Sequence, residues 1–148
     1  MHIYSAFTSS DVSVTTAATT ILQIATPSTR RAKIIEAWVS FNSVTATDVP
    51  GLVELVQATS NGTSSAMTPV AWDRADPAAL CAAAITFTVE PTGPTVLMPF
   101  KQSPIGTTLI YQIPLGVEIE MLISSFVGIR LTCPQAESGI RALIKFQE

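Results

Sequence analysis

Apolar and polar residues alternate along most of the chain with a period of two, the spacing of a β-strand with one buried face. Three segments show the alternation clearly, with inward sets Val117, Ile119, Met121 and Ile123, then Val127, Ile129 and Leu131, then Ile140, Ala142, Ile144 and Phe146. DVSVTTAATTILQIATP, LVELVQAT, AITFTVEP, TVLMPF and TLIYQIPLG extend the pattern. The alternation predicts about eight or nine short strands.

Turn-forming residues separate these segments, in TPST, DVPG, SNGTSS, EPTGPT, QSPIG and CPQAESG. The prolines stand mostly near strand ends, as expected for a residue that cannot donate to a sheet. Short strands without helical segments between them indicate an antiparallel sandwich or barrel. We therefore predict an all-β fold.

One segment favours a short helix. In DRADPAALCAAA, Asp76 can serve as the N-cap, Pro77 fits the first helical position, and the alanines that follow are strong helix formers. The sequence predicts one short helix over residues 77–84, inside a long loop that runs from Ser60 to Ala84.

The length of 148 residues suits one domain. We predict a single β-sandwich domain over residues 12–148 and an N-terminal arm over residues 1–11. The arm carries Ile3, Tyr4 and Phe7, whose apolar groups need burial. Two destinations are open: a partner surface, or the arm's own sandwich, where it would cover Trp38.

The segment RRAKIIEAWVSF is apolar on both faces. Read with a period of two, one face holds Ile35, Ala37, Val39 and Phe41, and the other holds Ile34, Glu36, Trp38 and Ser40. A sheet with one solvated face should not carry Ile34 and Trp38 on that face. The loop over residues 60–84 or a neighbouring subunit would have to cover them, and Trp72 is expected to anchor the loop or join the interface.

Composition favours the neighbouring subunit. Charged residues make up 13% of the chain, about half of the usual share, and the mean hydropathy is +0.42. No apolar run is long enough for a membrane helix, because polar and turn residues interrupt the most apolar region, over residues 109–131. The N-terminus has no basic start and no long apolar run, so we predict no signal peptide and no membrane partner. Abundant Ser and Thr explain part of the low charge, and burial by neighbouring subunits explains the rest, so we predict a homo-oligomer.

The charges and cysteines exclude other classes of protein. The net charge is −3 and the basic residues are dispersed, so we predict no nucleic-acid partner. Cys81 and Cys133 are too few for a disulfide framework and lack metal spacing. We predict two separate, reduced thiols.

Catalytic residue types are scarce. His2, the only histidine, lies in the predicted arm, so no Ser-His-Asp or Cys-His arrangement is expected. Glu118 and Glu120 share one strand face and could bind calcium or act as an acid–base pair, but an isolated acid pair is usually a solvated face. Asp73 and Asp76 resemble part of a calcium loop but lack its Gly and distal Glu, so we interpret Asp76 as a helix cap and Asp73 as part of a loop network with Arg74. We predict no enzymatic activity, no cofactor and no metal.

The order of several phrases resembles a known class of proteins. DVSVTTAATTILQIATPSTRRAKIIEAWVSFNSV is followed by a strand, by AWDRADPAAL in a long loop, by FTVEPT and by YQIPLG. Over nearly the whole chain this order resembles small structural virion proteins of tailed phages, including head decoration (cement) proteins. The resemblance implies a jelly-roll-like β-sandwich without catalytic residues. It also implies a trimer that is made in the host cytoplasm and binds the major capsid protein on the capsid exterior.

The residues and the resemblance together define the candidate interface, which comprises Ile3, Tyr4, Phe7, Ile34, Trp38 and Trp72. An alternative function is a carbohydrate-binding or adhesin-like β-sandwich module of a phage fibre or cell surface. That function would use loop aromatics such as Trp72 and Tyr111.

Overall fold

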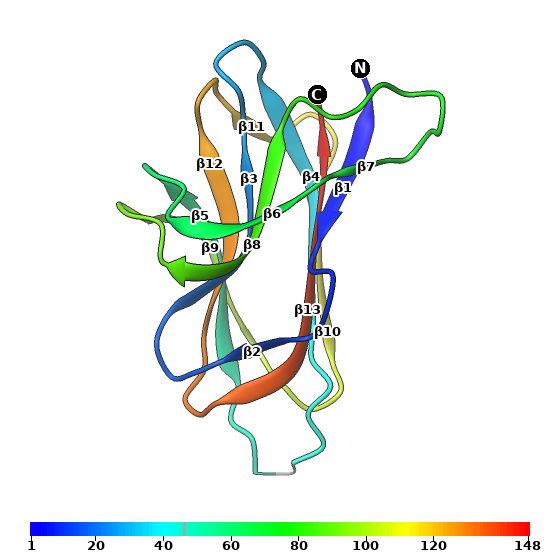
Figure 1. Cartoon of the computed structure of the whole chain (residues 1–148). Coiled ribbons are helices and arrows are strands. Elements are labelled where there is room, and N and C mark those ends of the chain that lie inside the picture. The colour runs from blue at the N-terminus through cyan, green and yellow to red at the C-terminus, as the bar shows by residue number, and fades with distance from the viewer. Residues whose placement is uncertain (46) are drawn as a thin grey trace.

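The computed structural model describes residues 1–45 and 47–148. Over these residues the chain forms thirteen β-strands and no helix. The strands build two antiparallel sheets that face each other, with both termini at one end of the molecule (Figure 1). The prediction of an all-β antiparallel sandwich is confirmed. No helix that could span a membrane occurs in the described part of the chain.

The first sheet, called sheet I here, has the strand order β10–β4–β13–β1–β7. Strand β11 also pairs with β4, and β2 pairs with β13. The bounds are β1 Ile3–Phe7, β2 Val12–Val14, β4 Ala32–Ser40, β7 Val70–Ala71, β10 Thr108–Gln112, β11 Ile119–Met121 and β13 Glu137–Gln147. The first and last strands of the chain, β1 and β13, are therefore neighbours inside one sheet.

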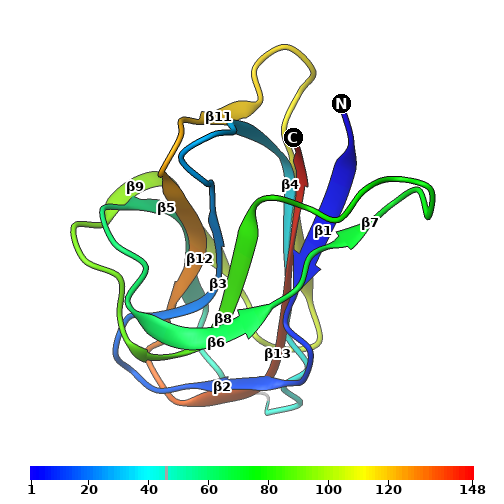
Figure 2. The ribbon, with the colours of Figure 1, turned by 45° about the horizontal axis from the view of Figure 1, so that its top comes forward.

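The second sheet, sheet II, has the order β6–β8–β3–β12–β5–β9. Its bounds are β3 Thr19–Ala25, β5 Gly51–Ala58, β6 Thr63–Met67, β8 Ala82–Val89, β9 Thr95–Gln102 and β12 Phe126–Thr132. Figure 2 shows β3, β12 and β8 across the interior from β4 and β13. Because the chain passes repeatedly between the sheets, most neighbouring strands are distant in sequence.

One apolar core fills the space between the sheets. The inward sets predicted for β12 and β13 are confirmed as buried: Val127, Ile129 and Leu131 on the first, and Ile140, Ala142, Ile144 and Phe146 on the second. The set predicted around β11 is confirmed only in part. Met121 is buried, but Val117 and Ile123 are exposed because the strand covers only Ile119–Met121. The turns on either side carry these two residues out of the sheet.

The N-terminal residues form a strand within sheet I, so of the two destinations left open for residues 1–11 the structure shows the chain's own sandwich. Strand β1 lies between β13 and β7, with Tyr4 opposite Phe146 and their rings stacked 5.6 Å apart. The backbone of His2 exchanges two hydrogen bonds with that of Glu148. The β-strand periodicity of residues 3–8 has the same physical basis as elsewhere in the chain: alternate side chains are buried in the core.

The helix predicted over residues 77–84 is absent. Asp76 does not act as an N-cap, because its carboxylate contacts the imidazole of His2. The carboxylate of Glu148 accepts hydrogen bonds from the backbone N–H groups of Leu80 and Cys81. The alanines that follow enter β8 and pair with β3. Tertiary hydrogen bonds therefore override the high helix propensity of alanine.

Candidate functional site

A β-bulge in β4 decides which side chains reach the surface of sheet I. Lys145 pairs with Glu36, but the next residue, Phe146, pairs with Ile34, so Ile35 is an extra residue without a partner on β13. Its carbonyl instead accepts a hydrogen bond from the N–H of Ile113. An extra residue reverses the facing of the strand. Ile34 consequently lies wholly in the core, and needs neither a loop nor a neighbour to cover it.

Beyond the bulge, four apolar side chains form a line across the outer face of sheet I. Ile110 on β10 lies opposite Trp38 on β4, Trp38 opposite Leu143 on β13, and Leu143 opposite Phe7 on β1. Trp38 is 38% exposed and Ile110 is 51% exposed. We call these four residues the apolar row. On the sequence alone, the loop over residues 60–84 and the N-terminal residues were both possible covers for Trp38. In the structure neither of them covers it.

Polar residues border the apolar row on both sides. One neighbouring row runs through Gln112, Glu36, Lys145 and Ser5, and it ends at the apolar Val70 on β7. The row on the other side runs through Thr108, Ser40 and Arg141.

A groove of about 280 Å³ lies along the apolar row. It is lined by Phe7, Thr8, Trp38, Ser40, Thr108, Arg141, Ala142 and Leu143. Arg141 is held by Asp11 through an Nε–Oδ1 contact of 2.5 Å. An apolar strip inside a polar border is the usual anatomy of a protein–protein interface.

Trp72 lies at the other end of the same face. Its backbone N–H donates to the carbonyl of Ile3, which continues the pairing of β7 with β1. The Lys145 ammonium sits 3.8 Å from the centre of the indole ring. Trp72 is 61% exposed, so this cation–π contact leaves most of the side chain accessible.

The structure divides the six predicted interface residues into two groups. Phe7, Trp38 and Trp72 contribute to the outer face of sheet I, and Ile3 takes the outward phase of β1. Tyr4 and Ile34 are buried in the core, which corrects their prediction as interface residues.

Sequence reasoning omitted two members of the apolar row, Ile110 and Leu143. Leu143 stands between Arg141 and Lys145 on the outward phase of a regular strand. An apolar residue among charged ones at such a position could have identified it as a surface contact. Ile110 carries the same kind of signal, because it stands between Thr108 and Gln112 on the outward phase of TLIYQIPLG.

A histidine–carboxylate contact lies where the termini meet. His2 Nδ1 is 2.7 Å from Asp76 Oδ1, so the histidine is held against the loop after β7. The Tyr4 hydroxyl donates to the carbonyl of Pro77. Burial, and secondarily a hydrogen bond to Glu148, raise the pKa of the Cys81 thiol, which disfavours its thiolate form. The contacts join the chain ends to the loop after β7.

The acid pairs are engaged in local contacts. Glu120 contacts Arg31 at 3.1 Å and Glu118 contacts Lys33 at 3.9 Å. A hydrogen bond from the N–H of Gly116 lowers the pKa of Glu118. Asp73 accepts from the N–H of Ala75 in a turn. No group of three or more metal-ligating side chains occurs within residues 1–45 and 47–148.

The two aromatic residues considered for carbohydrate binding lie on different faces. Tyr111 lies opposite Ala37 and points between the sheets, where its ring is 5.3 Å from that of Phe100. Trp72 is on the outer face of sheet I. These two side chains therefore do not form a shared platform for a sugar.

Comparison with known proteins identifies no relative: no family model matches the chain, and no curated protein or solved structure matches it significantly.

Proposed function

We propose that the chain is a virion structural protein of a tailed phage, a head decoration (cement) protein that binds the exterior of the assembled capsid and stabilises it. The observation that carries the proposal is the apolar row on the outer face of sheet I, with its polar border. The order of sequence phrases supplies the resemblance to this class. A charge content of 13% agrees with a chain whose surface is partly buried in a lattice.

The outer face of sheet I is the surface proposed to contact the major capsid protein. Trp38 lies at the centre of the row, between Ile110 and Leu143. Tryptophan at the centre of a dry patch is a frequent hot spot of binding. The polar rows would exclude water and set the orientation. The row stands on paired strands, whose backbone is already ordered before binding, so little conformational freedom is lost.

Stabilisation would follow from mass action, without any chemical step. A protein that binds the assembled shell better than its separate subunits shifts the equilibrium toward the shell. Many copies on one capsid add their contributions, so each contact can be weak. The threefold arrangement that the resemblance implies stays a prediction.

Quantitative mass spectrometry of purified virions tests the proposal. The phage whose genome encodes the chain should contain it in a copy number comparable to that of the major capsid protein. Added to capsids stripped of it, the purified chain should bind and raise the temperature at which the shells open. Absence from the virion, or presence at only a few copies, would contradict a decoration role.

A matched pair of variants tests the binding face. Trp38→Ser removes the centre of the apolar row, while Val89→Ser alters a 57% exposed residue at the end of β8 in sheet II, away from the outer face of sheet I. We expect Trp38→Ser to lose capsid binding and Val89→Ser to keep it. Equal binding by both variants would assign the contact to another surface.

A further inference from the structure

Strand β10 ends sheet I with an unpaired row of backbone groups. The Phe41 N–H donates to the Thr107 carbonyl, and the Ile113 N–H donates to the Ile35 carbonyl. In an antiparallel ladder these bonds alternate, so Leu109 and Tyr111 direct their N–H and C=O groups toward β4. Thr108, Ile110 and Gln112 direct theirs away from the sheet, and β10 has no other strand neighbour among the described residues.

The other sheet edges carry features that discourage pairing. Strand β9 contains Pro99 and Lys101, and its register shifts at Leu55 of its partner strand. The register of β6 also shifts, and β7, β2 and β11 have only two or three residues. Short strands, proline, lysine and bulges are the usual protections of a free edge. Strand β10 has five residues and contains no proline, charge or register shift.

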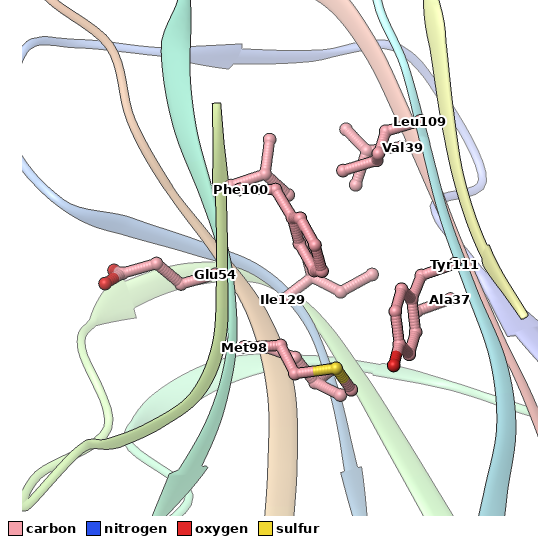
Figure 3. A pocket seen from close by; sticks show the side chains of 10 residues that line it. Ala37, Val39, Glu54, Met98, Phe100, Leu109, Tyr111 and Ile129 are labelled. Carbon is pink, nitrogen blue, oxygen red and sulfur yellow. The ribbon is translucent and has the colours of Figure 1, made fainter. Parts of the chain in front are cut away.

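The inner side of the same edge is apolar and incompletely closed. A notch between β9 and β10 is lined by Met98 and Phe100 from one sheet and by Leu109 and Tyr111 from the other (Figure 3). These four side chains are only half-buried. Glu54, which also borders the notch, points away from it in Figure 3. The β10 edge therefore offers backbone hydrogen bonds with apolar surface on both faces.

We propose that β10 pairs with β10 of a second copy of this chain, antiparallel and across a twofold axis at Ile110. This register uses every outward backbone group, because Ile110 faces its own equivalent and Thr108 faces Gln112. About six hydrogen bonds form in the three pairs. The sheets of the two copies join into one continuous sheet, and the inward Leu109 of each copy packs beside Tyr111 of the other.

Self-complementarity is the reason to assign the edge to a second copy. The outward groups are arranged symmetrically about Ile110, as an isologous contact requires. No charged side chain lies on β10, so the twofold axis brings no like charges together. Ile110 is the last member of the apolar row. Pairing at Ile110 therefore joins the two rows end to end into one strip across both copies.

Pairing through β10 predicts that the free protein in solution contains an even number of chains. A threefold contact through another surface would add to it and give a hexamer, whereas a trimer alone would leave the β10 edge unpaired. The inference does not depend on the proposed capsid role, because it concerns the free protein in solution. Its failure would leave capsid binding by the outer face untouched.

Light scattering after size-exclusion chromatography is the first test. The wild-type chain at micromolar concentration should have the mass of a dimer or of a multiple of dimers. Ile110→Lys places two ammonium groups opposite each other and should halve the mass. Val70→Lys is the matched control, since Val70 is 50% exposed and Ile110 is 51% exposed. A monomeric or trimeric wild type, or Ile110→Lys at the wild-type mass, would overturn the proposal.

Cross-linking supplies a second test that does not depend on tolerance of a buried charge. Opposed residues of a hydrogen-bonded pair have Cα atoms about 5.5 Å apart, within the range of a disulfide. The native thiols of Cys81 and Cys133 are buried and free. Under mild oxidation Ile110→Cys should run as a covalent dimer on a non-reducing gel, and Val70→Cys should not. Equal cross-linking of the two variants, or none in Ile110→Cys, would contradict the pairing.

Discussion

Ile34 and Trp38 share one phase of the period-two pattern on β4, yet Ile34 is wholly buried and Trp38 is 38% exposed. The bulge at Ile35 separates them, because it reverses the facing of the strand between the two positions. The same bulge lets Ile34 pack with the core while Trp38 joins the apolar row. The surface proposed to bind the capsid thus depends on one extra backbone residue.

Substitutions at these two positions should separate stability from binding. Ile34→Ala leaves a cavity in the core and should lower the free energy of unfolding by about 2–5 kcal/mol. Trp38→Ser should change it by less than about 1 kcal/mol, because the indole is partly solvated on an outer face. Urea unfolding followed by circular dichroism measures both. A larger loss in Trp38→Ser than in Ile34→Ala would show that the facing described for β4 is incorrect.

Removal of the N-terminal residues should unfold the protein. Strand β1 pairs with both β13 and β7, so deletion of residues 1–9 exposes β13 and removes Tyr4 from the core. Tyr4→Ala alone should cost about 3–5 kcal/mol, by analogy with other buried aromatic truncations. Ile3→Ser, at an outward position of the same strand, is the control and should cost much less. A truncated protein with an unchanged melting temperature would restore the interpretation of residues 1–11 as an arm.

The Glu54–Arg130 pair should contribute more than any exposed ion pair. The Arg130 Nε and Nη2 atoms lie 2.9 and 2.8 Å from Glu54 Oε2, and both side chains are largely buried on neighbouring strands. Glu54→Ala leaves the guanidinium without its partner and should cost about 3–5 kcal/mol. Glu120→Ala breaks the exposed contact with Arg31 and should cost less than about 1 kcal/mol. Urea unfolding measures the free energy of unfolding of both variants. Similar losses for Glu54→Ala and Glu120→Ala would contradict this ranking.

Glu137 should make stability depend on pH. Burial, with a smaller contribution from the Asp48 carboxylate, raises the pKa of Glu137 above its ordinary value. The folded state therefore binds this proton more tightly than the unfolded state does. The contribution of Glu137 to stability is greatest below the unfolded-state pKa, about 4.3. It falls as the pH rises through the folded-state pKa.

Glu137→Gln should accordingly gain stability relative to the wild type as the pH rises through the folded-state pKa of Glu137. Glu118 supplies a control of opposite sign, because a backbone hydrogen bond lowers its folded-state pKa. The contribution of Glu118 to stability is present above the unfolded-state pKa and is lost as the pH falls through the folded-state pKa. Glu118→Gln should therefore lose stability relative to the wild type as the pH rises. Urea unfolding between pH 3 and pH 8 measures both differences. Parallel curves for the two variants would refute the assignment.

The native thiols should be unreactive in the folded protein. Burial raises the pKa of Cys81 and of Cys133, and Glu148 adds to the rise at Cys81. Thiolate is the reactive species, so alkylation by iodoacetamide at pH 8 should be slow in buffer and fast in denaturant. Rapid labelling of either cysteine in the folded state would also invalidate Val70→Cys as a clean cross-linking control.

Alternation of apolar and polar residues was sufficient to determine the fold class and much of the core. On β12 and β13 the pattern is regular, because a strand buried on one face must place every second side chain inside. Low charge and the outward Trp38 also predict a surface that binds a partner, which stays a prediction. These are local properties, and a sequence records them directly.

The tertiary structure decided where the local pattern breaks and which segments meet. The bulge at Ile35 depends on the register between β4 and β13, strands that lie about a hundred residues apart in the chain. Residues 77–84 are rich in helix formers, but the Glu148 carboxylate and β3 take up their backbone groups. The apolar row unites Phe7, Trp38, Ile110 and Leu143 from four strands. Pairing between such distant segments sets these positions, and periodicity within a segment carries no record of its partner.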